Sequence, residues 1–173
     1  MLEITFKLLE KPQVTLVKDW LKEDHVAEFW YGEGLKSTLR SIDRFVDGQE
    51  PLFTLWLAYD KEIPFAYLMT SPIKSLDELP FSKYLTAESK AMTLDLFIGE
   101  KAYLGKGLAH HLIQELIRQK FPDTTDTFID PDVNNTRAIH VYEKAGFKKL
   151  EEFTPNWPPF QPSFLMRRTN KPR

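Results

Sequence analysis

Two neighbouring stretches decide the fold of this chain: LDLFIG at residues 94–99 and LGKGLA at residues 104–109. The first alternates as a strand does, and the second opens a helix on two alternating glycines. Three of the chain's seven glycines fall between positions 99 and 107. A helix that begins in this way leaves backbone N–H groups free and unshielded by side chains, which favours a bound phosphate. We therefore expect a strand, a glycine-rich loop, a helix, and a phosphate-bearing ligand at the loop.

Two well-known phosphate loops do not fit these residues. A P-loop has four residues between its first glycine and Gly-Lys, followed by Ser or Thr for magnesium. Here five residues separate Gly99 from Gly105, and a glycine follows Lys106. The dinucleotide-binding pattern fails because His110 stands where a small residue is needed for close packing. These departures argue against a nucleotide triphosphatase and against a dehydrogenase.

Hydrophobic patterning on either side of the glycine loop predicts alternating strands and helices. Before it we expect a strand at 3–9, helical turns within 14–30, a helix at 35–45, and a hairpin of strands 53–59 and 63–69. In the first strand, Ile4, Phe6 and Leu8 should share one face. Residues 71–90 show no clear period and predict a loop or short helix near a rim. After the loop we expect a helix at 107–120, a strand at 127–129, a helix from Asn134 or Asn135 to Gly146, and closing strands at 147–153 and 163–168.

The composition is that of an ordinary globular protein. With 173 residues, 42% hydrophobic and 28% charged, the chain can form one domain with a substantial core. It has no cysteine, so it offers neither a disulfide framework nor a thiol nucleophile. No apolar run approaches the roughly 18 residues of a membrane span, and no signal-peptide pattern opens the sequence. We expect a cytoplasmic protein without membrane contacts, and the net charge of −2 argues against nucleic acid as the ligand.

A second motif, NTRAIHVYEKAGF, lies at residues 135–147. Its spacing resembles the Asn-x-x-Ala-x-x-x-Tyr-x-x-x-Gly-Phe signature of the GNAT superfamily of N-acetyltransferases, and every keyed position is met. The superfamily's pyrophosphate loop has the pattern Gln/Arg-x-x-Gly-x-Gly/Ala. Gly107 and Ala109 match this pattern, while Leu104 stands where Gln or Arg is usual. Together the two motifs cover about residues 92–150.

A narrower resemblance extends almost from end to end. The pairs WL at 20–21 and FW at 29–30, the sequence IDP at 129–131 and the two motifs are similar to the aminoglycoside 6′-N-acetyltransferases. That subgroup also tolerates Leu at position 104. Siderophore-type lysine N-acyltransferases share the same general framework, so more than one amine acceptor is compatible with the sequence.

The resemblance implies a single GNAT domain over residues 1–173. This α/β (α+β) fold has a central mixed, mostly antiparallel sheet of six or seven strands flanked by helices. The resemblance also implies that the protein uses acetyl-CoA as co-substrate and needs no metal. A backbone N–H near Phe97 or Ile98 would bond the acetyl carbonyl, and the pantetheine arm would lie beside that strand like another strand. The residues implied to bind the co-substrate are Phe97, Ile98, Leu104, Gly105, Lys106, Gly107, Leu108, Ala109, Asn135, Ala138 and Tyr142.

Asp95 and Tyr142 are the expected catalytic residues. Asp95 lies in mid-strand and should point away from its two leucine neighbours, and a carboxylate there is costly unless it faces a cleft or a partner. We expect it to receive the substrate ammonium and take its proton, directly or through water; a salt-bridged structural aspartate is the alternative. The Tyr142 phenol can protonate the departing sulfur as the C–S bond breaks, or it can be a core residue of its helix.

Four residues are expected to hold the acceptor: Asp95, Asp130, Trp30 and Glu33. Asp130 matches an acidic substrate position of the aminoglycoside subgroup, although an aspartate before proline is also common in turns. Trp30 and Glu33 would line the amine pocket from the first helical region. Trp157, in the proline-rich loop at 155–160, would close it, and each of these residues could instead be structural.

The sequence therefore predicts acetyl transfer from acetyl-CoA to a primary amine of a small cationic substrate, with the 6′-amine of an aminoglycoside as the leading acceptor. The same chemistry on a siderophore lysine, a polyamine or a protein amine is the nearest alternative. A non-catalytic CoA-binding module is the alternative from another class. We expect small-molecule partners only, in a monomer or a homodimer.

Overall fold

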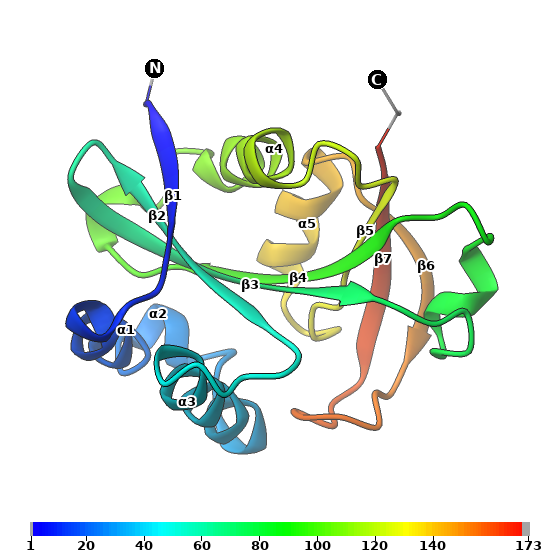
Figure 1. Ribbon diagram of the computed structural model, residues 1–173, viewed down its shortest axis with the longest axis horizontal. Helices are drawn as coiled ribbons and strands as arrows, with labels where there is room; N and C mark the ends of the chain where they lie inside the picture. The colour runs from blue at the N-terminus through cyan, green and yellow to red at the C-terminus, as the bar shows by residue number, and fades with distance from the viewer. Residues whose placement is uncertain (1, 171–173) are drawn as a thin grey trace.

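One seven-stranded sheet forms the centre of the molecule (Figure 1). The computed structural model describes residues 2–170; Met1 and the last three residues of the expected domain lie outside that range. In the order β1-β2-β3-β4-β5-β7-β6, every neighbouring pair is antiparallel except β4 and β5, which are parallel. The predicted mixed, mostly antiparallel sheet is confirmed. Its strands are β1 (Ile4–Leu8), β2 (Thr54–Asp60), β3 (Ile63–Ile73), β4 (Ala91–Ile98), β5 (Asp126–Ile129), β6 (Lys148–Phe153) and β7 (Ser163–Thr169).

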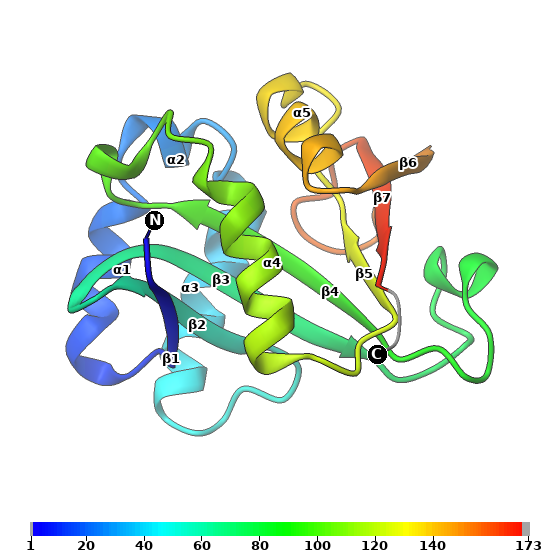
Figure 2. The same ribbon diagram turned by 90° about the horizontal axis from the view of Figure 1, so that it is seen from above.

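Helices cover both faces of this sheet (Figures 1 and 2). The first three helices lie on one face and the last two on the other. Their bounds are α1 (Val14–Trp20), α2 (Asp24–Ala27), α3 (Gly32–Val46), α4 (Leu108–Lys120) and α5 (Thr136–Lys144). Short 3₁₀ helices are η1 (Lys11–Gln13), η2 (Phe81–Tyr84) and η3 (Lys101–Tyr103). The strands and α-helices lie close to where the sequence predicts them, except that α3 begins at Gly32 instead of Leu35 and β3 continues to Ile73, into the segment expected to be a loop or short helix. The short helices η1 and η3 were not predicted.

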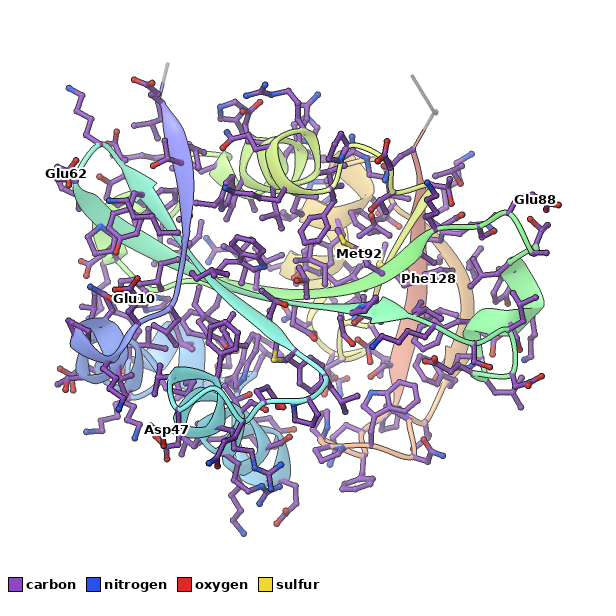
Figure 3. All side chains as sticks on the ribbon, in the orientation of Figure 1. Glu10, Asp47, Glu62, Glu88, Met92 and Phe128 are labelled. Atoms are coloured by element: carbon purple, nitrogen blue, oxygen red, sulfur yellow. The ribbon has the colours of Figure 1, made fainter. Side chains whose placement is uncertain are left out.

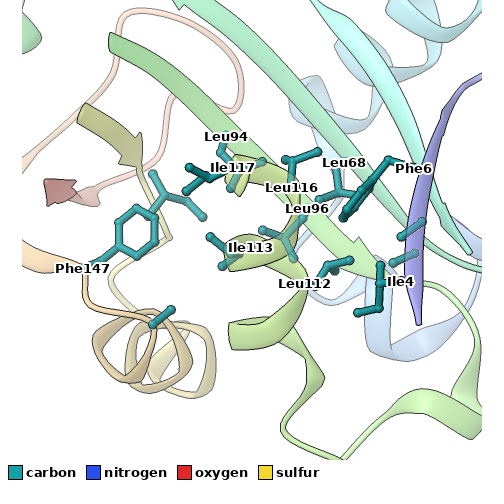
Figure 4. Packing of buried hydrophobic residues seen from close by; sticks show 14 of the residues in the cluster. Ile4, Phe6, Leu68, Leu94, Leu96, Leu112, Ile113, Leu116, Ile117 and Phe147 are labelled. Carbon is teal, nitrogen blue, oxygen red and sulfur yellow. The ribbon is translucent and has the colours of Figure 1, made fainter. Parts of the chain in front are cut away.

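The main hydrophobic core lies between the sheet and α4 (Figure 4). Apolar residues of α4 recur at helical spacing and meet the alternate leucines of β4, so each element buries one continuous apolar face. Side chains at the periphery such as Glu62 and Glu88 extend into solvent, while Met92 lies in the interior (Figure 3). The buried residues of this contact are Leu94, Leu96, Leu112, Ile113, Leu116 and Ile117.

The end of β1 departs from the predicted pattern. Ile4 and Phe6 are buried in the main core, but Leu8 is 50% exposed, while Leu9 is only 2% exposed. The main core does not extend to Leu8. The chain leaves the strand here, and the Leu9 side chain enters the second core beneath α1 and α3 instead. The expectation that Leu8 shares the buried face was therefore wrong.

β4 and β5 pair over a short length, and this opens the molecule. Their register joins Ala91 to Asp126, Met92 to Thr127 and Thr93 to Phe128, after which the two strands diverge (Figure 2). Beyond Thr93, β4 has a paired neighbour among the described strands on one side only, which is β3. The backbone groups on the other edge must find different partners.

Gly99, directly after β4, allows a close approach of Trp20. A Cβ at position 99 would overlap the indole ring, which is itself 3% exposed and fixed in the second core. The indole Nε1 donates a hydrogen bond to Glu100 Oε1 at 2.8 Å, so α1 is held against the end of β4. Gly99 is therefore needed for the close packing of Trp20. Of the three glycines from which the phosphate loop was predicted, only Gly105 and Gly107 remain candidates for that loop.

We predict that Gly99→Ala lowers the free energy of unfolding by about 3 kcal/mol, because the added methyl must displace a large, buried ring. Denaturant unfolding measures the change. The matched experiment repeats the substitution in a Trp20→Leu background, where the cost should fall to well under half. An equal cost in both backgrounds would show that the indole is not the cause.

Candidate active site

A cavity of about 1000 Å³ lies beside the point where β4 and β5 separate. Its walls come from both halves of the chain: α2 and α3 on one side, β4 in the floor, and the start of α5 with the loop at 154–162 on the other. Of the residues singled out from the sequence, this cavity brings together Trp30, Asp95, Phe97, Asp130, Asn135, Ala138, Tyr142 and Trp157.

Asp95 enters the cavity because of strand alternation. Leu94 and Leu96 face the main core, so the residue between them points to the opposite face of the sheet. Burial raises the pKa of Asp95 from its ordinary value of 3.8 to about 6. Among the described residues it forms no ion pair, so the salt-bridged alternative has no support. A carboxyl group in this state can accept a proton near neutral pH.

Asp130 directly follows β5 and enters the same cavity. Burial raises the pKa of this carboxyl well above its usual range, and the negative charge of Asp95 raises it further. The nearby indole N–H of Trp157 offsets part of this effect. The two carboxyl groups therefore act on each other, and both are harder to ionise together than singly.

Tyr142 is positioned by a helix with well-defined ends. Asn135, one of the two asparagines predicted to begin this helix, caps α5, because its side-chain oxygen accepts a hydrogen bond from the Ala138 N–H at 3.1 Å. At the other end, the N–H of Phe147 bonds the carbonyl of Tyr142 at 3.0 Å and closes a Schellman motif around Gly146. Burial and then the charges of the two aspartates raise the pKa of Tyr142, so its phenol stays protonated.

The hydrogen bonds of β4 indicate which of its backbone N–H groups could bond the acetyl carbonyl, a choice that the sequence left open between Phe97 and Ile98. The Gly99 N–H bonds the carbonyl of Phe65 on β3 at 2.9 Å. Because N–H groups alternate along a strand, that of Phe97 also points to β3, whereas those of Leu96 and Ile98 point to the open side. Of the two predicted donors, Ile98 is therefore suitable and Phe97 is not. Phe97 contributes its ring, which lines the cavity.

The glycine loop at 104–109 lies outside the wall of this cavity, at the N-terminus of α4. Gly105 and Gly107 have φ values of +71° and +66°, which side-chain-bearing residues rarely adopt, and a Cβ at either position would meet open space. Gly107 caps the helix without a side-chain hydrogen bond, so the first amides of α4 point outward unshielded. Lys106 lies 5.7 Å from the centre of the Tyr103 ring and adds a positive charge. These features fit a pyrophosphate.

The wall of the cavity is acidic. Five carboxylates line it, against one lysine, Lys74, among the residues that the structure describes. Glu78 and Asp132 accept hydrogen bonds from backbone amides of their own loops. None of the five forms an ion pair within residues 2–170, so the remaining three are available to a cation: Asp77, Asp95 and Asp130.

Trp30 and Glu33, predicted together, have different positions. Trp30 lines the cavity, packs edge to face on Phe97 with ring centres 5.0 Å apart, and donates from Nε1 to Thr38 at 2.9 Å. Glu33 is absent from the described lining. It forms an exposed ion pair with Lys36 at 2.9 Å, the next turn of α3, and this contact lowers the pKa of its carboxyl. The structure therefore gives no support to Glu33 as an acceptor residue.

Sequence reasoning missed Asp77 and His25. Asp77 lies in the aperiodic segment at 71–90, where no pattern marks a residue as facing a cavity. His25 lies in the four-residue helix α2 and reaches the end of β4, 73 positions away in sequence. Within the described range, no three or more His, Asp and Glu side chains gather as a metal site would require, and no helix there is long and apolar enough to cross a membrane.

Comparisons with known proteins point to one family. Residues 11–155 match the family model of the acetyltransferase (GNAT) domain. The chain is 30% identical over 155 residues to an aminoglycoside N(6′)-acetyltransferase type 1 of Klebsiella pneumoniae, covering 84% of this chain and 74% of that protein. Its structure is similar to that of an aminoglycoside N(6′)-acetyltransferase from Legionella pneumophila, with 40% identity, a TM-score of 0.86, and 98% and 93% of the two chains covered. A structure of AAC(6′)-Ib with paromomycin and acetyl-CoA matches at 25% identity and a TM-score of 0.76, covering 96% and 93%.

The raised pKa of Asp95 predicts a pH-dependent cost to stability. In the folded chain the carboxyl ionises near pH 6 and in the unfolded chain near its ordinary value, so stability falls as pH rises between these values. We expect Asp95→Asn to raise the free energy of unfolding by about 2 kcal/mol at pH 8. At pH 4 the gain should be small. Denaturant unfolding at both pH values measures it; a loss of stability of equal size at both would contradict the assignment.

Proposed function

This chain belongs to the GNAT family of acetyltransferases, and we propose that it transfers the acetyl group of acetyl-CoA to the 6′-amine of an aminoglycoside. The observation that carries the proposal is the acidic wall of the cavity, whose five carboxylates form no ion pair within the residues that the structure describes. Aminoglycosides carry several ammonium groups on a compact set of rings. Such an acceptor supplies positive charges to a wall whose carboxylates outnumber its single lysine.

Asp95 has the properties of the group that deprotonates the acceptor. An ammonium ion must lose a proton before its nitrogen can attack, and a carboxylate with an ordinary pKa of 3.8 is a weak base for this step. The burial that raises the pKa of Asp95 to about 6 narrows the gap to the amine. Asp95 would take the proton directly or through a water molecule.

The N–H of Ile98 and the phenol of Tyr142 would serve the other end of the reaction. When bound, acetyl-CoA supplies a thioester whose carbonyl oxygen gains negative charge as the nitrogen attacks. Ile98 would donate its free-edge N–H to that oxygen. Tyr142 would donate its phenolic proton to the sulfur as the C–S bond breaks, so that a thiol leaves. Starting from the ammonium ion, the nitrogen loses two protons: Asp95 would take the first before the attack, and the Tyr142 phenolate would recover the second, directly or through water, as the amide forms. Asp95 then releases its proton to solvent, so the transfer yields the amide, the free CoA thiol and one proton.

Binding of the acceptor would also prepare Tyr142. Burial and then the negative charges of Asp95 and Asp130 raise the pKa of this phenol, which opposes proton donation. Ammonium groups bound beside the two aspartates would offset those charges. The pKa of Tyr142 would then be lower in the presence of the acceptor than in its absence.

Asp130, Asp77 and Trp157 would hold the body of the acceptor. The charge of Asp95 contributes to the raised pKa of Asp130, so these two carboxyl groups interact. Asp130 therefore suits a second ammonium group on the same molecule. Asp77 lines the cavity from the segment before η2. Trp157 stacks on Phe81 with ring centres 6.0 Å apart and presents an apolar wall to sugar rings.

We infer that residues 1–173 act as one domain in the cytoplasm, as a monomer or a homodimer.

The nearest rival is the same transfer to a siderophore lysine or to a polyamine. Those acceptors are thin chains, whereas this cavity has a volume of about 1000 Å³, which is enough for several joined rings. The cavity contains both Asp95 and Tyr142, which argues against a non-catalytic CoA-binding module. Such a module needs neither a buried base nor an acid.

We predict that the purified protein releases free CoA thiol from acetyl-CoA in the presence of kanamycin or tobramycin. Mass spectrometry and NMR of the product should place one acetyl group on the 6′-nitrogen. Paromomycin, which carries a hydroxyl in place of the 6′-amine, is the matched control and should compete without being acetylated. Turnover with N6-hydroxylysine or spermidine but not with aminoglycosides would move the protein to the rival class, and no turnover with any amine would end the enzyme proposal.

Tyr142→Phe should lower kcat by roughly 100-fold or more, because the phenol is removed while the ring is kept. Calorimetric binding of CoA should change less than threefold. Unchanged turnover in this variant would remove Tyr142 from the mechanism, and an equal loss of CoA binding would make it a binding residue.

A further inference from the structure

His25 has one ring nitrogen that is engaged and one that is buried without a partner. Its Nε2 lies 2.9 Å from the carbonyl oxygen of Ile98, at the end of β4. Its Nδ1 is shielded from solvent and has no hydrogen-bond partner among the described residues. The side chain lines the cavity. An unpaired buried nitrogen of this kind costs stability, so it needs an explanation.

The contact with Ile98 places a proton on one nitrogen of the ring. A carbonyl oxygen can only accept a hydrogen bond, so Nε2 is the donor in this contact. In the neutral form of the ring Nδ1 is then a lone-pair acceptor, and the partner it lacks is an N–H or O–H donor. Because Nδ1 is shielded from solvent, a ligand that brings this donor must displace the groups that cover it.

The position of His25 indicates where this donor comes from. Ile98 lies on the free edge of β4, on the glycine-loop side of Asp95, and its carbonyl points to the open side as its N–H does. An extended ligand between the glycine loop and Asp95 must pass this point. The pantetheine arm of CoA is such a ligand, and it carries amide N–H groups and a hydroxyl along its length.

We propose that His25 binds the pantetheine arm of acetyl-CoA, with Nδ1 accepting a hydrogen bond from an amide N–H or hydroxyl of that arm. This inference rests on the proposed function. His25 thus joins α2, which lines the acceptor cavity, to the strand that carries the thioester. An ammonium group of the acceptor is a weaker candidate, because the carboxyl groups of Asp77, Asp95 and Asp130 offer it better partners elsewhere in the wall.

The test compares two ligands by calorimetry. CoA contains the pantetheine arm, and adenosine 3′-phosphate 5′-diphosphate is its nucleotide without that arm. His25→Leu, which removes both ring nitrogens but fills the space, should weaken CoA binding roughly tenfold and leave the nucleotide's affinity within twofold. His25→Gln should recover most of the loss, since its amide can donate to Ile98 and still present an oxygen.

Glu23→Ala is the matched control. Glu23 precedes α2 and pairs with Lys101 at 2.8 Å on the surface, outside the cavity, so its loss loosens the same segment without touching Nδ1. Binding of both ligands should stay within twofold of wild type. A comparable loss in this variant would assign the His25 effect to tethering of α2 and overturn the proposal.

A measurement on the unaltered protein covers the case in which His25→Leu does not fold. The chain has four histidines, so the ¹⁵N resonances of His25 can be identified by their absence in His25→Gln. The free protein should show the Nε2–H tautomer, and CoA but not the nucleotide should shift Nδ1. A shift with both ligands, with an aminoglycoside alone, or with neither would overturn the proposal. Wild-type protein that binds no CoA would refute the proposed function itself.

Discussion

The early separation of β4 from β5 is the constraint on which the rest of this structure depends. Three residue pairs join the strands, and beyond Thr93 the N–H and C=O groups on one edge of β4 lack a neighbouring strand. Buried backbone groups require partners, so this edge is either covered by the protein or reserved for a ligand. Here it is both: His25 covers the carbonyl of Ile98, and the N–H groups of Leu96 and Ile98 stay open.

The same separation explains why the two faces of the sheet contribute different chemistry. Residues of β4 that face α4 are apolar and packed in the main core, Leu94 and Leu96 among them, and those on the other face include Asp95 and Phe97. Because β5 turns away, Asp130 at its end and Tyr142 on α5 approach the same space from the far side. If β5 had stayed paired with β4, there would be no cavity between these groups.

The sequence predicts those parts of the site that depend on neighbouring residues, and it does not predict those that depend on contacts between residues far apart in the chain. The cap at Asn135, the left-handed glycines of the loop and the alternation around Asp95 are local, so the spacing of residues was sufficient to find them. The contacts of Trp20 with Gly99 and of His25 with Ile98 join residues more than 70 positions apart, and no local pattern marks them. Glu33 illustrates the converse: its place near Trp30 suggested the pocket, but one helical turn directs it to Lys36 in solvent.

The three groups in the cavity form one electrostatic unit, and this links binding to chemistry. Asp95 raises the pKa of Asp130, and both raise the pKa of Tyr142, so without a cation the site opposes ionisation of each member. A single ammonium group near Asp95 would relieve only part of this repulsion. An acceptor with several ammonium groups can neutralise Asp130 while presenting another nitrogen to Asp95, which keeps that carboxylate charged and able to take a proton. The acidity that makes the empty cavity unfavourable therefore selects for acceptors with more than one positive charge.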